Sequence, residues 1–140
     1  MSYLSPDSGA FIGFRESTLP RGKSLDQDNQ GREFRSRIVD LILANHPEYA
    51  LKLLSEYYGV SPPEIRVGTV KGHRRALGCY VERERRIYVS KSEYLCVPFV
   101  ILHEFYHHLR ASQINRNRQV EKRADLFASN YIQDFRHIHK

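Results

Sequence analysis

The feature that constrains this chain most is the pentapeptide His103-Glu104-Phe105-Tyr106-His107, which reads HExxH and lies inside an apolar run. The spacing of that run predicts a buried helix over residues 96–111. Residues four apart share one face of a helix, so both imidazoles can bind one metal ion. Glu104 is rotated by about 100° from His103, where its carboxylate can take a proton from a water on the metal. The motif therefore predicts a zinc site with an adjacent general base.

A second helical stretch, residues 120–135, supplies carboxylates close behind the motif. Its apolar residues recur at helical spacing, and Glu121 and Asp125 are expected on or beside the inward face. Catalytic zinc usually has three protein ligands and one open position, so Glu121 is the candidate third ligand. Asp125 is the candidate partner for the free ring N–H of a ligating histidine, in particular His103. The alternative is that both carboxylates pair on a solvated face with Arg118, Lys122 or Arg123.

This ordered combination resembles the ImmA/IrrE-type small zinc metallopeptidases, which are gluzincins. In that family a Gly-x-Tyr and Ile-x-Val hairpin precedes the HExxH helix, and a helix with Glu-x-x-Ala-x-x-Phe-Ala follows it. The matching residues of this chain are Gly78-Cys79-Tyr80, Ile87-Tyr88-Val89, and then Glu121, Ala124, Phe127 and Ala128. The match covers about residues 60–135.

The resemblance implies a zincin-like fold and one Zn²⁺ held by His103, His107 and Glu121, with Glu104 as the general base of peptide-bond hydrolysis. It also implies a protein or peptide substrate, which in some members is a regulator or repressor, and a sheet edge that binds the substrate backbone. The residue that stabilises the oxyanion stays open, with four candidates: His73, Tyr80, Tyr131 and His137. His108 is expected to be a structural or surface residue.

The remaining pattern predicts one α+β domain with a small antiparallel sheet packed on helices. The expected elements are helices over 32–45 and 47–58, a strand near 65–69, and a hairpin of strands over 77–81 and 86–90. We therefore expect a zincin-like metallopeptidase domain over 32–140 and an irregular N-terminal arm over 1–31. A short polar loop over 112–119 predicts nearly antiparallel helices around it, and the tail over 136–140 is expected to be disordered.

The composition leaves two further function classes open. The net charge of +6 is spread over the chain, so nucleic-acid contact is allowed but not required. The alternatives to a peptidase are a non-catalytic zinc-binding interaction module and a basic nucleic-acid-binding domain with an accidental HExxH. No apolar stretch approaches the roughly 20 residues of a membrane span, and no export signal is recognisable, so we expect a cytoplasmic protein without membrane contact.

Overall fold

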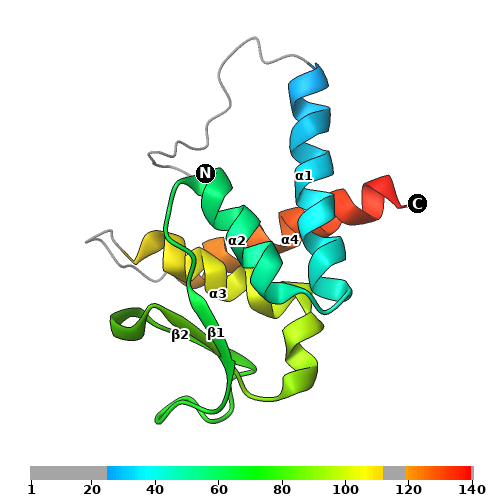
Figure 1. The fold of residues 1–140 in the computed structure, drawn as a ribbon. Helices are drawn as coiled ribbons and strands as arrows, with labels where there is room; N and C mark the ends of the chain where they lie inside the picture. Colours follow the sequence, from blue (N-terminus) through cyan, green and yellow to red (C-terminus); the bar gives the residue numbers. More distant parts are fainter. Residues whose placement is uncertain (1–24, 112–118, 140) are drawn as a thin grey trace.

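Four helices and a three-stranded sheet form an α+β arrangement in the computed structural model, which describes residues 25–111 and 119–139 (Figure 1). In chain order the elements are α1 (Leu25–Leu43), α2 (Pro47–Tyr58), β1 (Glu64–Val67), β2 (Gly78–Val81), a 3-10 turn (Glu82–Glu84), β3 (Arg86–Val89), a second 3-10 turn (Ser92–Cys96), α3 (Pro98–Arg110) and α4 (Gln119–Ile138). In this part of the chain no helix is long and apolar enough to cross a membrane.

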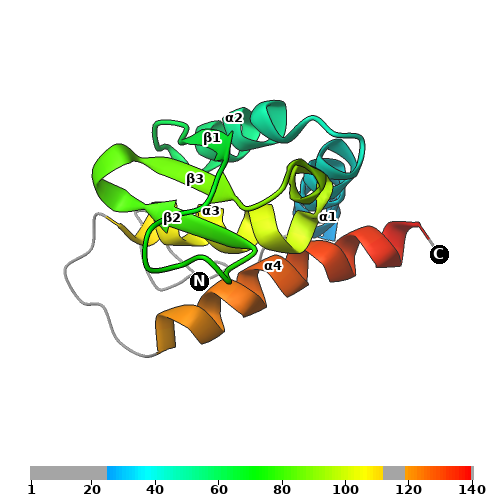
Figure 2. The same ribbon diagram turned by 90° about the horizontal axis from the view of Figure 1, so that it is seen from below.

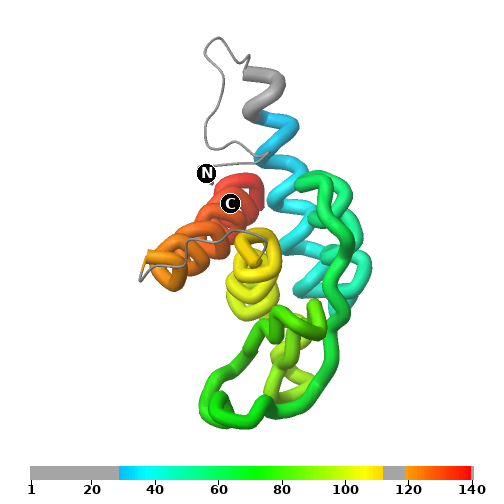
Figure 3. The backbone as a smooth tube through the Cα atoms, turned by 90° about the vertical axis from the view of Figure 1, so that its left-hand side faces the viewer, coloured from blue at the N-terminus to red at the C-terminus, as the bar shows by residue number. Residues whose placement is uncertain are grey.

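Helix α3, which carries the HExxH motif, lies at the centre of the arrangement. Pro98 is its first residue, a position where the missing N–H of proline removes no helical hydrogen bond. The helix packs against α4 and also against β2 and β3. Figures 1 and 2 show α3 and α4 running in opposite directions, and Figure 3 shows α4 and the sheet on different sides of α3. The expected antiparallel arrangement of these two helices is therefore observed.

The sheet is mixed, so the expectation of a purely antiparallel sheet is wrong. Its strand order is β1-β3-β2. The predicted hairpin is confirmed, because β2 and β3 pair antiparallel with Tyr80 opposite Ile87. However, β1 pairs parallel to β3, with Ile65 opposite Ile87. Residues 68–77 connect β1 to β2 across the position that β3 occupies in the sheet. As a result β3 lies between the other two strands, and β2 is an edge strand.

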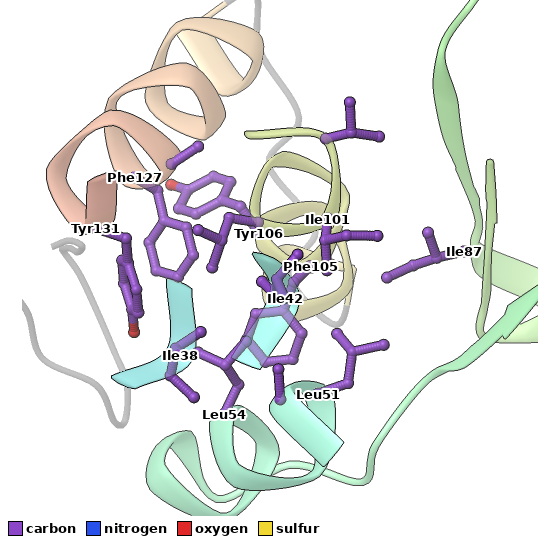
Figure 4. Close-up of a cluster of buried hydrophobic side chains, with 14 of the residues drawn as sticks. Ile38, Ile42, Leu51, Leu54, Ile87, Ile101, Phe105, Tyr106, Phe127 and Tyr131 are labelled. Atoms are coloured by element: carbon purple, nitrogen blue, oxygen red, sulfur yellow. The ribbon is translucent and has the colours of Figure 1, made fainter. Parts of the chain in front are cut away.

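The hydrophobic core surrounds α3 with side chains from the other helices and from β3 (Figure 4). Phe105 is fully buried in one cluster with Ile42 of α1, Leu51 of α2 and Ile87 of β3. A second layer joins α3 to α4, where the ring centroids of Tyr106 and Phe127 lie 5.4 Å apart. Every helix and β3 contribute to this core, so the orientation of α3 is set by the whole domain.

Two boundaries differ from expectation. Residues 25–31 form the first turns of α1 although they carry no apolar period, because extending an existing helix adds one hydrogen bond for each residue fixed. The rest of the predicted arm, residues 1–24, lies outside the described residues. Helix α4 continues to Ile138, and the rings of Phe135 and His139 lie 4.4 Å apart, so the predicted disordered tail is largely helical. Helix α2 ends as predicted at Gly59, whose φ of 72° is left-handed.

Candidate metal centre

His103 and His107 face one another across one turn of α3. Their Nε2 atoms lie 3.3 Å apart. Both side chains are mostly covered by protein, since α3 is buried on most of its surface. The i, i+4 spacing thus directs both imidazoles to one point, as the sequence predicts.

Glu121, near the start of α4, brings a carboxylate to the same point. Its Oε1 lies 3.1 Å from His103 Nε2, and its Oε2 lies 2.9 Å from His107 Nε2. Three donor atoms of these residues all lie within 4.8 Å of one another. In a tetrahedral zinc site with bonds of about 2.0–2.1 Å, neighbouring ligand atoms lie about 3.3 Å apart. Two imidazole nitrogens and one carboxylate oxygen at this spacing fit a zinc ion with a fourth position open.

Asp125 lies one turn beyond Glu121, on the far side of the His103 ring. Its Oδ1 is 2.9 Å from His103 Nδ1. The carboxylate stands off the line of the ring N–H, so the pair is an ionic contact rather than an aligned hydrogen bond, and Nδ1 is otherwise buried without a partner. Asp125 and His103 are therefore close enough to interact, as predicted, although no hydrogen bond between them is formed.

Glu121 and Asp125 lie beside the inward face of α4, as the sequence allows, and they are well exposed there. The side chains of Glu121 and Asp125 are 70% and 57% exposed, so neither lies on the inward face of α4. That face is formed by residues such as Ala124 and Ala128, and the carboxylates stand at its edge. Among the described residues, the ion-pair partners of both carboxylates are histidines of α3. One side of the candidate centre is therefore open to solvent.

Glu104 is the buried acid of the site. It is 8% exposed, and its Oε2 lies 4.0 Å from His103 Nε2. Burial raises the pKa of Glu104 to about 7, and the negative charge of Glu121 acts in the same direction. The positive charge of His103, when protonated, and a hydrogen bond from the backbone N–H of Tyr80 favour the ionised form and oppose that rise. A carboxyl group with this pKa can accept and release a proton near neutral pH.

Gly78 explains how β2 comes close enough to hold Glu104. A Cβ on Gly78 would lie 2.7 Å from Val100 Cγ1 and 3.2 Å from Glu104 Cγ. The strand can therefore approach α3 only because this residue has no side chain. The approach places the Tyr80 N–H against the Glu104 carboxylate. Sequence reasoning did not assign Gly78 a role, although its place in the Gly-x-Tyr element was a signal.

These residues line a cleft of about 620 Å³ between β2 and the two helices. Both histidines, Glu104 and Glu121 lie in its wall. The rest of the lining comes from the loop before β2, from β2 and the 3-10 turn after it, from the end of α3 and from the start of α4, namely His73, Ala76, Gly78, Cys79, Tyr80, Glu82, Arg110, Ala111 and Val120.

The candidates for the oxyanion donor are not equivalent in position. The Tyr131 hydroxyl is buried 2.7 Å from the Tyr58 hydroxyl and is absent from the cleft lining. His137 is exposed in the last turn of α4 and is also absent from it. Tyr80 lines the cleft, but its hydroxyl lies 2.8 Å from His108 Nδ1. His73 is the candidate that lines the cleft from the loop before β2.

His108 is a structural residue, as predicted. It is buried, and its Nε2 lies 2.7 Å from the Ser61 carbonyl oxygen, which can only accept a hydrogen bond. We therefore assign the proton to Nε2, and Nδ1 accepts from the Tyr80 hydroxyl. Burial lowers the pKa of His108, which favours this neutral form. The side chain ties α3 to β2 and to the segment before β1.

No protein-family model matches this chain, and no similar curated protein or solved structure is found.

Proposed function

We propose that this protein is a zinc-dependent metallopeptidase with a zincin-like fold, which hydrolyses peptide bonds of a protein or peptide substrate. The observation that carries the proposal is the convergence of His103, His107 and Glu121 on one point in a cleft, with the buried carboxyl group of Glu104 beside them. A metal site alone would not need a buried acid next to its ligands. An acid with a pKa near 7 suits proton transfer at neutral pH.

The three ligands would hold Zn²⁺, which when bound acts as a Lewis acid that polarises a carbonyl group and lowers the pKa of water. Glu104 takes a proton from the attacking water and later gives it to the leaving amine. The N–H of Tyr80 holds the Glu104 carboxylate in place for both transfers. Asp125 orients the ring of His103 through Nδ1, so that Nε2 stays available as a ligand.

The substrate backbone is proposed to lie along β2. This strand is at the edge of the sheet, and Gly78, Cys79 and Tyr80 line the cleft. An extended peptide can add to an edge strand as a further strand through main-chain hydrogen bonds, beside the Tyr80 N–H, which already donates to Glu104. The peptide bond beside Tyr80 would then pass close to Glu104.

The test compares the wild-type protein with Glu104→Gln, both loaded with zinc, on a mixture of unstructured peptides analysed by mass spectrometry. We expect both proteins to hold about one zinc per chain, and the variant to lose at least about 100-fold in cleavage rate, the usual contribution of a general base. Glu48→Gln, an exposed change on α2, is the matched control and should cut like wild type. Zinc-loaded wild type that cuts no peptide would instead indicate a non-catalytic zinc-binding module.

A further inference from the structure

Arg110 is the last residue of α3, and it lies on the same helical face as the two histidines. It follows His107 by three residues and His103 by seven, spacings that repeat on one face of a helix. Arg110 also lines the cleft. Three residues of helix span about 4.5 Å along the axis, whereas one residue of an extended peptide spans about 3.3 Å. Along the helix axis, the backbone of Arg110 thus lies within the length of one or two extended-peptide residues of His107.

The guanidinium group of Arg110 is held by an aromatic ring rather than by an acid. Its Cζ lies 5.9 Å from the centroid of the Tyr106 ring, and Tyr106 is almost fully buried. Among the described residues, no carboxylate forms an ion pair with Arg110. Arg35 and Arg86, in contrast, pair with Asp134 and Glu64. Arg110 is therefore a partly buried cation in the cleft, oriented by the Tyr106 ring, without a carboxylate partner in the part of the chain that the structure describes.

The loop before β2 adds positive charge next to lining residues of the cleft. The loop that contributes His73 and Ala76 to the lining also carries Lys71, Arg74 and Arg75, all of which are exposed. Clustered charges of one sign at the mouth of a cleft raise the local concentration of ligands of the opposite sign. The lining holds three acids, Glu82, Glu104 and Glu121; the last two belong to the candidate centre, and Glu82 already has an interaction partner.

We propose that Arg110 is a specificity-determining residue that binds a carboxylate of the substrate one or two residues from the scissile bond. The proposal rests on the proposed peptidase function and names its substrate class, an acidic peptide. Arginine suits this role because its planar guanidinium group donates two parallel hydrogen bonds to a carboxylate. The carboxylate comes either from an Asp or Glu side chain or from the C-terminus of a peptide.

The test measures binding, so that it does not depend on turnover. The probes are short peptides with a hydroxamate head group, which ligates zinc, and each carries Asp or Asn at one of the two positions next to the hydroxamate. A second pair ends in a free or an amidated C-terminus. Affinities are measured by calorimetry for the zinc-loaded wild type, for Arg110→Glu, and for Arg136→Glu. The last variant makes the same charge change at an exposed position in the last turn of α4.

We expect the wild type and Arg136→Glu to prefer a carboxylate probe over its amide about 10-fold, as for one charge-assisted hydrogen-bonded pair. Arg110→Glu should lose or reverse that preference. The Asp and Asn pair identifies a side-chain carboxylate, and the free and amidated pair identifies a C-terminal one. Equal binding of all pairs by the wild type, or an unchanged preference in Arg110→Glu, overturns the proposal. A preserved preference without cleavage of any peptide overturns the peptidase function alone.

Discussion

Gly78 lies so close to Val100 that a Cβ on the glycine would approach Val100 Cγ1 to 2.7 Å. This contact sets the distance between the edge strand β2 and the helix that carries both histidines. We predict that Gly78→Ala forces β2 and α3 apart and displaces the Tyr80 N–H from Glu104. The overpacking should lower the free energy of unfolding by about 1–3 kcal/mol. Denaturant unfolding measures the loss of stability, and peptide cleavage tests the displacement.

The proposed zinc ligands lie on α3 and α4, away from Gly78. Gly78→Ala should therefore still bind about one zinc per chain, while its cleavage rate falls about 10-fold or more. Gly68→Ala is the matched control, because a Cβ there meets only Tyr88 at 3.7 Å, an ordinary contact. Full activity in Gly78→Ala would mean that the close approach of β2 does not position Glu104.

The second prediction concerns the stability of the metal-free protein as a function of pH. Folding raises the pKa of Glu104 from 4.5 to about 7. Between these values the folded protein keeps a proton that the unfolded chain releases, so the free energy of unfolding falls as pH rises from about 4.5 to about 7 and then levels. The loss from this group is on the order of 2–3 kcal/mol. Glu104→Gln carries no such proton and lacks this fall.

Urea unfolding in excess chelator at pH 4.5 and pH 8 checks this prediction. The wild type and Glu104→Gln should be of similar stability at the lower pH, and the variant should be the more stable by on the order of 2–3 kcal/mol at the higher pH. Glu48→Gln serves as the control, since Glu48 is exposed on α2. If the difference in the free energy of unfolding between the wild type and Glu104→Gln is the same at both pH values, Glu104 is solvated in the folded protein.

A third prediction distinguishes the structural role of His108 from the proposed metal-binding role of His107. His108→Ala removes the hydrogen bonds to Tyr80 and Ser61 and should lower the free energy of unfolding by about 2 kcal/mol. Zinc affinity should change little, whereas His107→Ala should weaken zinc binding by more than about 100-fold because it removes a ligand. His137→Ala, in the exposed last turn of α4, is the control. Zinc loss in His108→Ala, with the fold intact, would contradict the assignment.

A fourth prediction concerns Asp125, which we infer acts on zinc through the His103 ring. Asp125→Ala should weaken zinc binding about 10-fold, the lower end of the effect of such partners, because the side chain is more than half exposed. Competition with a zinc-binding dye measures the affinity, and Lys122→Ala on the same helix is the control. An effect as large as that of Glu121→Ala would mean that Asp125 is itself a ligand.

The local parts of the candidate site could be predicted from the sequence because they depend on helical spacing. His103 and His107 share a face whenever the segment is helical, and the apolar run around them requires a helix. The position of Glu121 followed from the short connection between α3 and α4. The exposure of Glu121 and Asp125 could not be read in this way, because it depends on the angle at which α4 crosses α3.

The parts that depend on contacts distant in sequence were missed. The parallel pairing of β1 with β3 depends on the route of residues 68–77, and alternation of apolar residues carries no information on strand direction. The role of Gly78 depends on how closely β2 approaches α3. The hydrogen bond from Tyr80 to Glu104 is a backbone contact, which side-chain identity does not reveal.

The proposed function depends on one zinc ion held by His103, His107 and Glu121. The most direct test compares the metal content of the purified wild-type protein with that of the Glu121→Ala variant. Both are measured by inductively coupled plasma mass spectrometry after dialysis at neutral pH. We predict about one zinc per wild-type chain and a greatly reduced zinc content in Glu121→Ala. A wild-type protein that binds no metal, even when zinc is supplied, would contradict this prediction.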